Sequence, residues 1–177
     1  MIARCAGAAD VIASVNFARE HELLVSVKGG GHNAAGNAVC EGGFMIDCSP
    51  MKSVRVDPKA RTAQVEPGVL LGELDHETQV FGLATSTGQV SMTGIAGLAL
   101  GGGWGWLSRT HGLTIDNLRA VDIVTADGTL LHASEEETED LFWGIRGGGG
   151  NFGVVTSFAF QLHEVGRLGL QLRHQGS

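Results

Sequence analysis

A histidine follows three consecutive glycines at the end of an apolar run that predicts a β-strand. The run covers residues 23–27, and after it come Lys28, Gly29, Gly30, Gly31, His32 and Asn33. Glycines carry no Cβ, so their backbone N–H groups can approach a phosphate closely and cup it. A neutral imidazole at the rim of such a cup is a nucleophile that can attack the 8α carbon of an isoalloxazine tautomer and leave a stable covalent link. The stretch therefore predicts a flavin-binding loop in which His32 is the covalent attachment point.

Three further glycine clusters occur in the chain. Glycine makes up 28 of the 177 residues, about 16%, against about 7% in ordinary proteins. The clusters are Gly88 with Gly94 and Gly97, residues 101–103, and residues 147–150 with Gly153. Each cluster taken singly is typical of a tight turn or a close helix contact. Four clusters in one acidic domain favour a cofactor that several glycine loops hold together.

Two of these loops match the glycine spacing of dinucleotide-binding proteins. A Rossmann site requires a strand before the glycines and a helix after them, whose N-terminus holds the diphosphate. The loop at residues 29–34 lacks the helix, and the loop at residues 148–153 precedes a predicted strand. This context disfavours a Rossmann NAD enzyme, and the absence of a GxxxxGK[ST] sequence excludes the standard P-loop.

The charge of the chain limits its partners. The formal net charge is -7, whereas nucleic-acid binding depends largely on Lys and Arg contacts to phosphate. We therefore expect a small-molecule substrate and no nucleic-acid partner. An acidic chain must hold an anionic cofactor with local backbone dipoles rather than with a positive field, and glycine loops supply such dipoles.

The cysteines and the hydropathy pattern indicate the environment of the chain. Cys5, Cys40 and Cys48 are odd in number and form no CxxC pair, which predicts free thiols in a reducing compartment. No apolar run reaches the roughly 20 residues of a membrane span, and the N-terminus does not resemble a signal peptide. We expect no membrane partner and a cytoplasmic location. The histidines other than His32 show no metal-ligand spacing, so no metal site is predicted.

The order of the predicted elements indicates an α+β fold with two subdomains. Strands are expected at residues 2–5, 23–27, 44–47, 54–56, 62–66 and 153–162, and helices at 9–20, 69–80 and 135–145, with two short helices on either side of residues 101–103. Residues 121–125 and 129–132 flank Ala126, Asp127 and Gly128 and predict a hairpin. We place the first subdomain in residues 1–56 and the second in 57–166, with an unplaced tail at 167–177.

Large side chains near the glycines have two interpretations each. The cations close to the glycine loops are Lys28, Arg109 and Arg146. The two arginines either contact phosphate or lie on the solvated surface. Trp104 and Trp106 either face a ring or, as is more common, pack in the core.

Four motifs together resemble a known family. They are VKGGGHN at residues 27–33, GIAGLALGGGWG at 94–105, GLTIDNL at 112–118 and DLFWGIRGGGGNFGVVT at 140–156. In this order they resemble FAD-linked oxidases of the vanillyl-alcohol-oxidase and p-cresol-methylhydroxylase superfamily. The similarity is greatest to the berberine-bridge-enzyme-like group and its bacterial hydroxynicotine and sugar oxidase relatives, and it extends from Ile2 to about residue 166.

The resemblance implies a fold, a cofactor and site residues. The fold would be the two-subdomain FAD-binding domain of the p-cresol-methylhydroxylase type, with FAD bonded to His32. Residues 29–33 (Gly29, Gly30, Gly31, His32 and Asn33) would wrap the pyrophosphate, and the segment with Gly88, Thr93, Gly94 and Gly97 would run along the cofactor. Gly101 belongs to the next glycine loop, and Val154 would contact the nucleotide end through its backbone.

The chain also departs from the family pattern. Some members attach the flavin a second time through a cysteine, and Val90 stands at that position, so the resemblance implies attachment through His32 alone. A substrate domain follows in the family, whereas this chain ends soon after residue 166 and contains no tyrosine. Its first residues match the middle of the family's first subdomain. We therefore expect an FAD-binding domain alone, as a fragment or a truncated product.

The expected function follows from the resemblance. A substrate of alcohol, amine or sugar-like type would lose a hydride to flavin N5, and dioxygen would reoxidise the flavin. The sequence assigns no catalytic acid or base. The alternative is a non-catalytic FAD-binding remnant that lacks its substrate domain.

Overall fold

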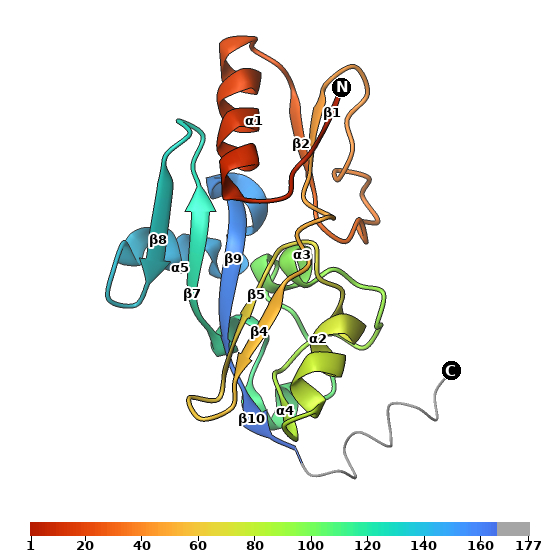
Figure 1. Ribbon diagram of the computed structural model, residues 1–177, viewed down its shortest axis with the longest axis vertical. Helices are drawn as coiled ribbons and strands as arrows, with labels where there is room; N and C mark the ends of the chain where they lie inside the picture. The colour runs from red at the N-terminus through yellow and green to blue at the C-terminus, as the bar shows by residue number, and fades with distance from the viewer. Residues whose placement is uncertain (166–177) are drawn as a thin grey trace.

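The computed structural model describes residues 1–165 and contains a small parallel sheet with a helix packed on it (Figure 1). The elements of this part are β1 (Ile2–Arg4), α1 (Ala8–Glu20), β2 (Val25–Lys28) and β3 (Phe44–Asp47). The strands run parallel in the order β1-β3-β2. Strand β2 is therefore an edge strand, and the glycines that follow it leave the sheet at this edge.

A larger antiparallel sheet forms the second part of the molecule. Its strands are β4 (Val54–Asp57), β5 (Thr62–Val65), β7 (Leu118–Val124), β8 (Leu130–Ser134) and β9 (Val154–Gln161), in the order β4-β5-β9-β7-β8. The central strand β9 buries Phe158 and Phe160 completely. Phe158 stands opposite Val65 on one neighbouring strand and Val121 on the other, so the core of this part forms around β9.

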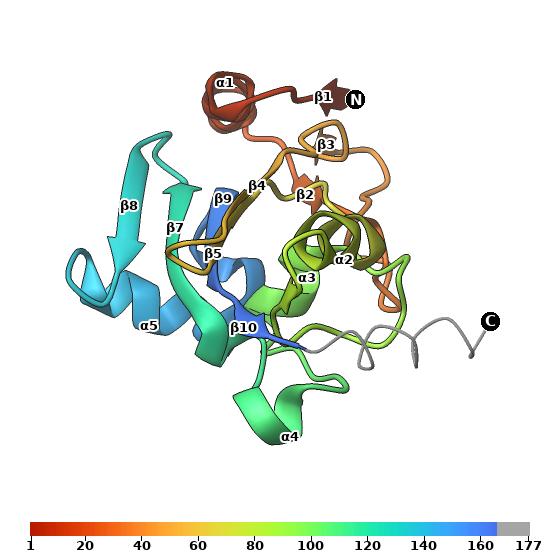
Figure 2. The ribbon, with the colours of Figure 1, turned by 60° about the horizontal axis from the view of Figure 1, so that its bottom comes forward.

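The other helices belong to this second part of the molecule (Figure 2). They are α2 (Leu71–Gln79), α3 (Ile95–Leu100), α4 (Ser108–His111) and α5 (Glu139–Gly148), with 3-10 turns η1 (Ile115–Asn117) and η2 (Gly149–Phe152) and a short pair of strands, β6 (Leu83–Ala84) and β10 (His163–Glu164). Helix α2 contacts β4, α5 contacts β8, and α3 contacts both α5 and η2.

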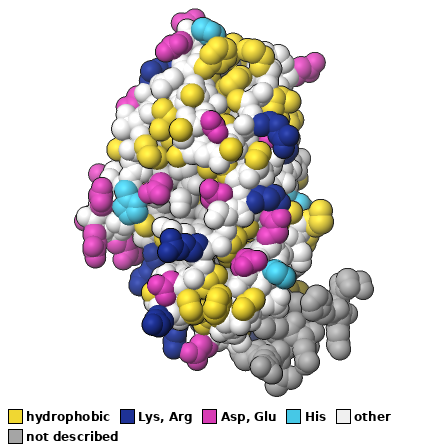
Figure 3. All heavy atoms as spheres, viewed as in Figure 1, with side chains coloured by type: hydrophobic (Ala, Val, Ile, Leu, Met, Phe, Trp, Pro, Cys, Tyr) yellow, Lys and Arg dark blue, Asp and Glu magenta, His cyan; other side chains and the backbone are white. Residues whose placement is uncertain are grey.

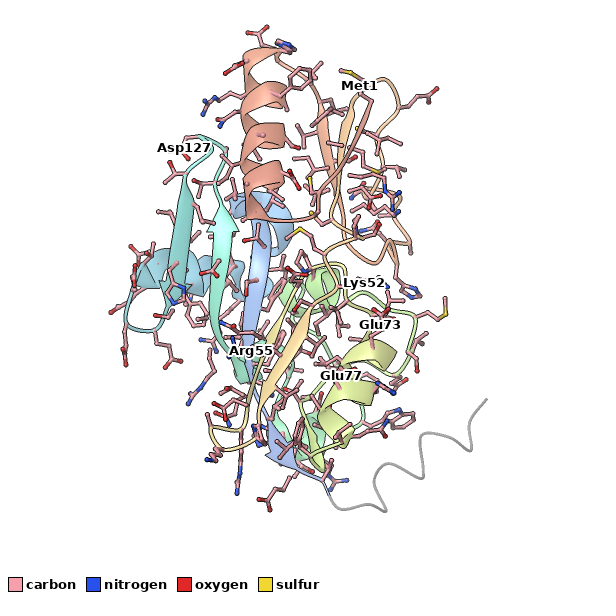
Figure 4. The ribbon with its side chains drawn as sticks, in the orientation of Figure 1. Met1, Lys52, Arg55, Glu73, Glu77 and Asp127 are labelled. Carbon is pink, nitrogen blue, oxygen red and sulfur yellow. The ribbon has the colours of Figure 1, made fainter. Side chains whose placement is uncertain are left out.

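The two parts share a core where α1 meets the larger sheet. Val124 and Val154 belong to the same apolar cluster as α1 and β3. The turn after β7, at Asp127 in Figure 4, docks on α1, because the guanidinium of Arg19 donates to the Asp127 carbonyl. Gly128 lies so close to Asn16 that a Cβ at this position would overlap the Asn16 amide.

Most predicted elements are confirmed, as is the α+β class. The hairpin at Asp127, the strand after the last glycine cluster and the two short helices around residues 101–103 all form. The chain passes from the first sheet to the second between Asp47 and Val54. The division into residues 1–56 and 57–166 stays a prediction, and the tail at 167–177 lies outside the described residues.

The predicted acidic helix over residues 135–145 begins later than expected. Ser134 Oγ accepts hydrogen bonds from the amides of Glu136 and Glu137, so these residues form a turn. Thr138 then takes a left-handed conformation with φ 55°, and α5 begins at Glu139. A side chain that bonds its own local backbone has competed with the helix.

The prediction that Trp104 and Trp106 pack in the core is wrong. The two side chains are 64% and 66% exposed. Gly102 and Gly103, with φ of 105° and 73°, turn the chain away from the end of α3, and the tryptophans follow on the surface.

The helices and the surface charges are relevant to contacts with membranes and polyanions. None of the helices within residues 1–165 combines the length and apolar character needed to cross a bilayer. On the face drawn in Figure 3, Lys and Arg side chains are interspersed with Asp and Glu, and no continuous basic patch is visible there.

We predict that a single thiol of the native protein reacts quickly. All three cysteines are free, with Cys5 and Cys48 buried and Cys40 half-buried. Burial raises the pKa of the Cys48 thiol to about 12 and also raises the pKa of Cys5, so both stay protonated near neutral pH and are poor nucleophiles. Ellman's reagent should label one thiol in native buffer and all three in denaturant. Rapid native labelling of a Cys40→Ser variant would contradict this.

Candidate functional site

A groove of about 590 Å³ lies beside the edge strand β2, between the small sheet and the α3 and η2 side of the larger one. Its volume is within the range of about 300–1,000 Å³ that ligand pockets occupy. Of the residues predicted from sequence, the lining contains Gly29, Gly30, Gly31, His32, Asn33, Gly94, Gly97, Gly101 and Val154. Residues from three distant glycine motifs therefore meet in one groove.

Direct contact between two glycine backbones forms the floor of the groove. A Cβ on Gly94 would lie 2.6 Å from the nitrogen and 2.7 Å from the Cα of Gly30. A Cβ on Gly29 would lie 2.7 Å from the carbonyl oxygen of Pro67. Distances below 3.0 Å leave no room for a side chain, so the approach of these segments requires glycine on both sides.

The loop after β2 lines the groove and contains unpaired amides. Gly31 has a φ of 74°, a conformation that favours glycine. Within residues 1–165, the amides of Gly30, Gly31 and His32 have no hydrogen-bond partner. Successive free amides around a left-handed residue form a concave nest that binds anions.

Other glycines leave space open on the opposite wall. A Cβ added to Gly97, Gly149 or Gly150 would meet nothing within 4 Å, although all three line the groove. The absence of side chains at these positions keeps the groove wide. The absence of side chains at Gly30 and Gly94 instead lets two segments of the chain touch.

No charged side chain lines the groove in the part of the chain that the structure describes. Lys28 instead lies 3.6 Å from Asp47, and the guanidinium of Arg146 lies 5.4 Å from the centre of the Phe142 ring. Arg109 is exposed on α4. An anion in this groove would therefore be held by backbone amides, as expected for an acidic chain.

His32 stands at the rim of the groove with an exposed side chain. Its neighbour Asn33 organises the next turn, since its Oδ1 accepts a hydrogen bond of 3.1 Å from the amide of Asn37. The imidazole is therefore both accessible and placed next to the free amides. No group of three or more ligating side chains among residues 1–165 could hold a metal ion.

Gly88 and Thr93 lie outside the groove lining. Gly88 faces Leu71 and Leu98, whose methyl carbons would lie 3.2 and 3.3 Å from a Cβ. The carbonyl of Thr93 accepts a hydrogen bond from the amide of Leu71. Both residues support the segment that carries Gly94 rather than forming the groove surface.

Some lining residues were missed in the sequence. Cys48 and Pro67 line the groove, but they are far from the glycine motifs along the chain and carry no pattern of their own. Gly149 and Gly150 were part of a candidate cluster, and the structure places this cluster in the lining. A more apolar pocket of about 400 Å³ adjoins the groove, with Val25, Val27 and Val154 common to both.

The model of the FAD binding domain family matches residues 1–134. The chain belongs to this family. (R)-6-hydroxynicotine oxidase of Paenarthrobacter nicotinovorans is 43% identical over 167 residues, which cover 94% of this chain and 36% of that protein. The crystal structure of 6-hydroxy-D-nicotine oxidase from Arthrobacter nicotinovorans matches with a TM-score of 0.90 at 44% identity, covering 92% of this chain and 36% of that one. BBE-like 1 of Physcomitrella patens matches with a TM-score of 0.88 at 33% identity, covering 93% and 36%.

These matches confirm the resemblance to FAD-linked oxidases and the berberine-bridge-enzyme-like group. The chain spans about 36% of the length of the relatives it matches. FAD is the cofactor of the family, and the groove of this FAD-binding domain fits it. The free amides of Gly30, Gly31 and His32 suit a diphosphate, and the bare faces of Gly97 and Gly149 leave room for a long ligand.

We predict opposite effects for two glycine substitutions. Gly30→Ala should destabilise the fold, because its Cβ meets the Gly94 backbone, which cannot move aside. Gly97→Ala should leave stability unchanged or raise it by up to about 1 kcal/mol, since alanine favours a helix and the position is open. The same methyl group should weaken FAD binding because it enters the groove. Urea unfolding and FAD titration test both variants, and a Gly97→Ala protein that binds FAD as the wild type does would contradict the placement.

Proposed function

We propose that this chain is the cofactor-binding part of an FAD-dependent oxidoreductase that takes a hydride from a small organic substrate. The observation that carries the proposal is the contact between Gly30 and Gly94. It brings together two family motifs and leaves an uncharged groove whose free amides end at an imidazole. The alcohol, amine or sugar-like class of substrate expected from the sequence is part of the proposal.

The diphosphate of FAD would lie on the free amides of Gly30, Gly31 and His32. Hydrogen bonds from amides to a charged oxygen are stronger than those between neutral groups. They are also independent of net charge, which is -7 for this chain. Local hydrogen bonds from backbone amides can therefore hold an anion even in an acidic protein.

The nucleotide end of FAD would lie toward Val154, where the apolar pocket of about 400 Å³ opens from the groove. This pocket is walled by Val25 and Val27 of the edge strand β2, which are each 41% exposed. A planar adenine ring would cover these side chains and remove apolar surface from water.

The flavin end would lie at the rim, where His32 would supply a ring nitrogen for a bond to the 8α carbon. Formation of this bond would release one proton from the 8α carbon and one from the imidazole and would leave two electrons on the flavin, and dioxygen would take up these electrons and two protons as hydrogen peroxide. When bound, FAD accepts the hydride of the substrate and passes two electrons to dioxygen, the acceptor that we propose. The free thiols of Cys5, Cys40 and Cys48 fit the cytoplasmic location that we also propose.

A second candidate is a domain that holds FAD without turnover. Within residues 1–165 the groove lining contains no Asp, Glu, Lys or Tyr, and the buried Cys48 has a pKa of about 12. Besides His32, the lining of the described residues offers no side chain of the types that serve as general bases. Anaerobic bleaching of bound flavin by an alcohol, amine or sugar would favour the oxidoreductase, whereas bleaching by dithionite alone would favour the second candidate.

We predict that the purified protein is yellow and keeps its flavin after acid precipitation. His32→Ala should still bind FAD through the glycines but should release it into the acid supernatant, because the covalent bond is missing. His76→Ala, at an exposed histidine on α2 with 75% exposure, is the matched control and should behave as the wild type. Flavin absorbance in pellet and supernatant measures the result. Retention of flavin by acid-treated His32→Ala would contradict the attachment, and a colourless chain that refuses added FAD would contradict the proposed function.

A further inference from the structure

Lys28 directly precedes the glycine loop, yet its side chain does not line the groove. Its Nζ lies 3.6 Å from Oδ1 of Asp47. The aliphatic part of the side chain runs beneath the loop, since a Cβ on Gly31 would lie 3.4 Å from the Cε of Lys28. Lys28 is thus part of the support of the loop rather than of its binding surface.

Asp47 is the partner that holds Lys28 in this position. It is the last residue of β3 and stands opposite Lys28 in the register of the sheet. Its side chain is only 8% exposed, and Arg4 Nε lies 4.0 Å from its second oxygen. The backbone reinforces the pair, because the amide of Cys48 donates a hydrogen bond of 2.8 Å to the carbonyl of Lys28.

The same carboxylate also holds the turn that follows β3. Oδ1 of Asp47 accepts a hydrogen bond of 3.0 Å from the amide of Ser49. The turn encloses Gly68, whose Cβ would lie 2.7 Å from the carbonyl oxygens of Ser49 and Met51. The residue before Gly68 is Pro67, whose carbonyl oxygen packs against Gly29. Asp47 therefore contacts Lys28 on one side of the start of the loop and holds the turn that positions Pro67 on the other side.

The ionisation of Asp47 is consistent with this role. Burial raises the pKa of the carboxyl group, but hydrogen bonds from Ser49 and the charges of Lys28 and Arg4 outweigh burial, and the net pKa is lowered. The ion pair is therefore present at neutral pH. The ordinary pKa of aspartate is about 4, and the pKa of Asp47 in the folded protein is lower. The stability that the ion pair contributes is therefore lost as the pH falls from about 4 through this lower pKa.

We infer that Lys28 and Asp47 are positioning residues, whose ion pair fixes the glycine loop so that the amides of Gly30, Gly31 and His32 face the groove. Glycines leave a loop many conformations, and a support from below selects one of them before a ligand arrives. A preorganised loop binds more tightly because less freedom is lost on binding. The inference rests on the proposed function of the groove as an FAD site.

The test compares FAD affinity and stability in matched variants of the full chain. All carry His32→Ala, so that binding is reversible, and FAD is titrated by flavin fluorescence. Lys28→Met and Asp47→Asn should each weaken FAD binding about tenfold, and Lys28→Arg should stay within about threefold of the parent because it keeps the charge. The double variant Lys28→Met/Asp47→Asn should bind no more weakly than the weaker single variant, since both remove one interaction.

Lys52→Met is the matched control. Lys52 forms an ion pair of 2.5 Å with Glu73 (Figure 4), and neither residue lines the groove. The same substitution there removes an ion pair whose side chains are 44% and 42% exposed, so it should change the urea unfolding midpoint less than Lys28→Met and should leave FAD affinity unchanged. If Lys28→Met fails to fold, Asp47→Asn and Lys28→Arg decide the question by the same titration.

The outcomes separate the two proposals. A His32→Ala parent that folds but binds no FAD contradicts the proposed function itself. A parent that binds FAD, together with Lys28→Met or Asp47→Asn variants within about twofold of it, overturns the positioning role while the FAD site stands. The positioning role is also overturned if the losses of affinity in the two single variants add up in the double variant. The same holds if Lys52→Met loses as much FAD affinity as Lys28→Met.

Discussion

The backbones of Gly30 and Gly94 touch, and the groove depends on this contact. One glycine follows the edge strand β2, and the other precedes α3. The Gly94 segment is held in place by neighbouring backbone hydrogen bonds, from Leu71 to the carbonyl of Thr93 and from Ile95 to the carbonyl of Val69. A side chain on either glycine would separate the loop from α3. The groove that we propose as the FAD site thus depends on the absence of two Cβ atoms.

Charge is kept out of the groove by pairing it elsewhere. Lys28 is paired with the buried Asp47, and Arg146 lies over Phe142 with Glu135 3.9 Å from its guanidinium. The surface that would face a ligand is therefore made of backbone amides, apolar side chains and polar side chains such as those of Asn37 and Asn151. This arrangement reconciles an acidic chain with an anionic cofactor, because fixed dipoles act at short range whereas a net charge of -7 acts over the whole molecule.

Local patterns in the sequence predicted the elements well where one feature dominated. The β3 strand and the hairpin at Asp127 are examples, since an apolar run and a turn sequence each have one structural solution. The helix over residues 135–145 began late because Ser134 bonded the local backbone, a competition that periodicity does not detect. Trp104 and Trp106 were expected in the core from their size, but the glycine turn before them places them on the surface.

The candidate site also contains residues that sequence motifs predicted and residues that only the fold brings to the groove. Nine of the eleven site residues predicted from the motifs line the groove, whereas Gly88 and Thr93 support the segment that carries Gly94. Cys48 and Pro67 carry no motif, and only the pairing of strands and turns brings them to the groove.

The sequence by itself determined which positions lack a Cβ, where the imidazole of His32 follows them, and to which family the four ordered motifs belong. Only the tertiary structure decided which glycines meet, which ones open the wall, and that Lys28 turns to Asp47 instead of the groove. The reason is physical. A missing side chain is a property of one residue, whereas a close approach depends on two segments that the fold alone brings together.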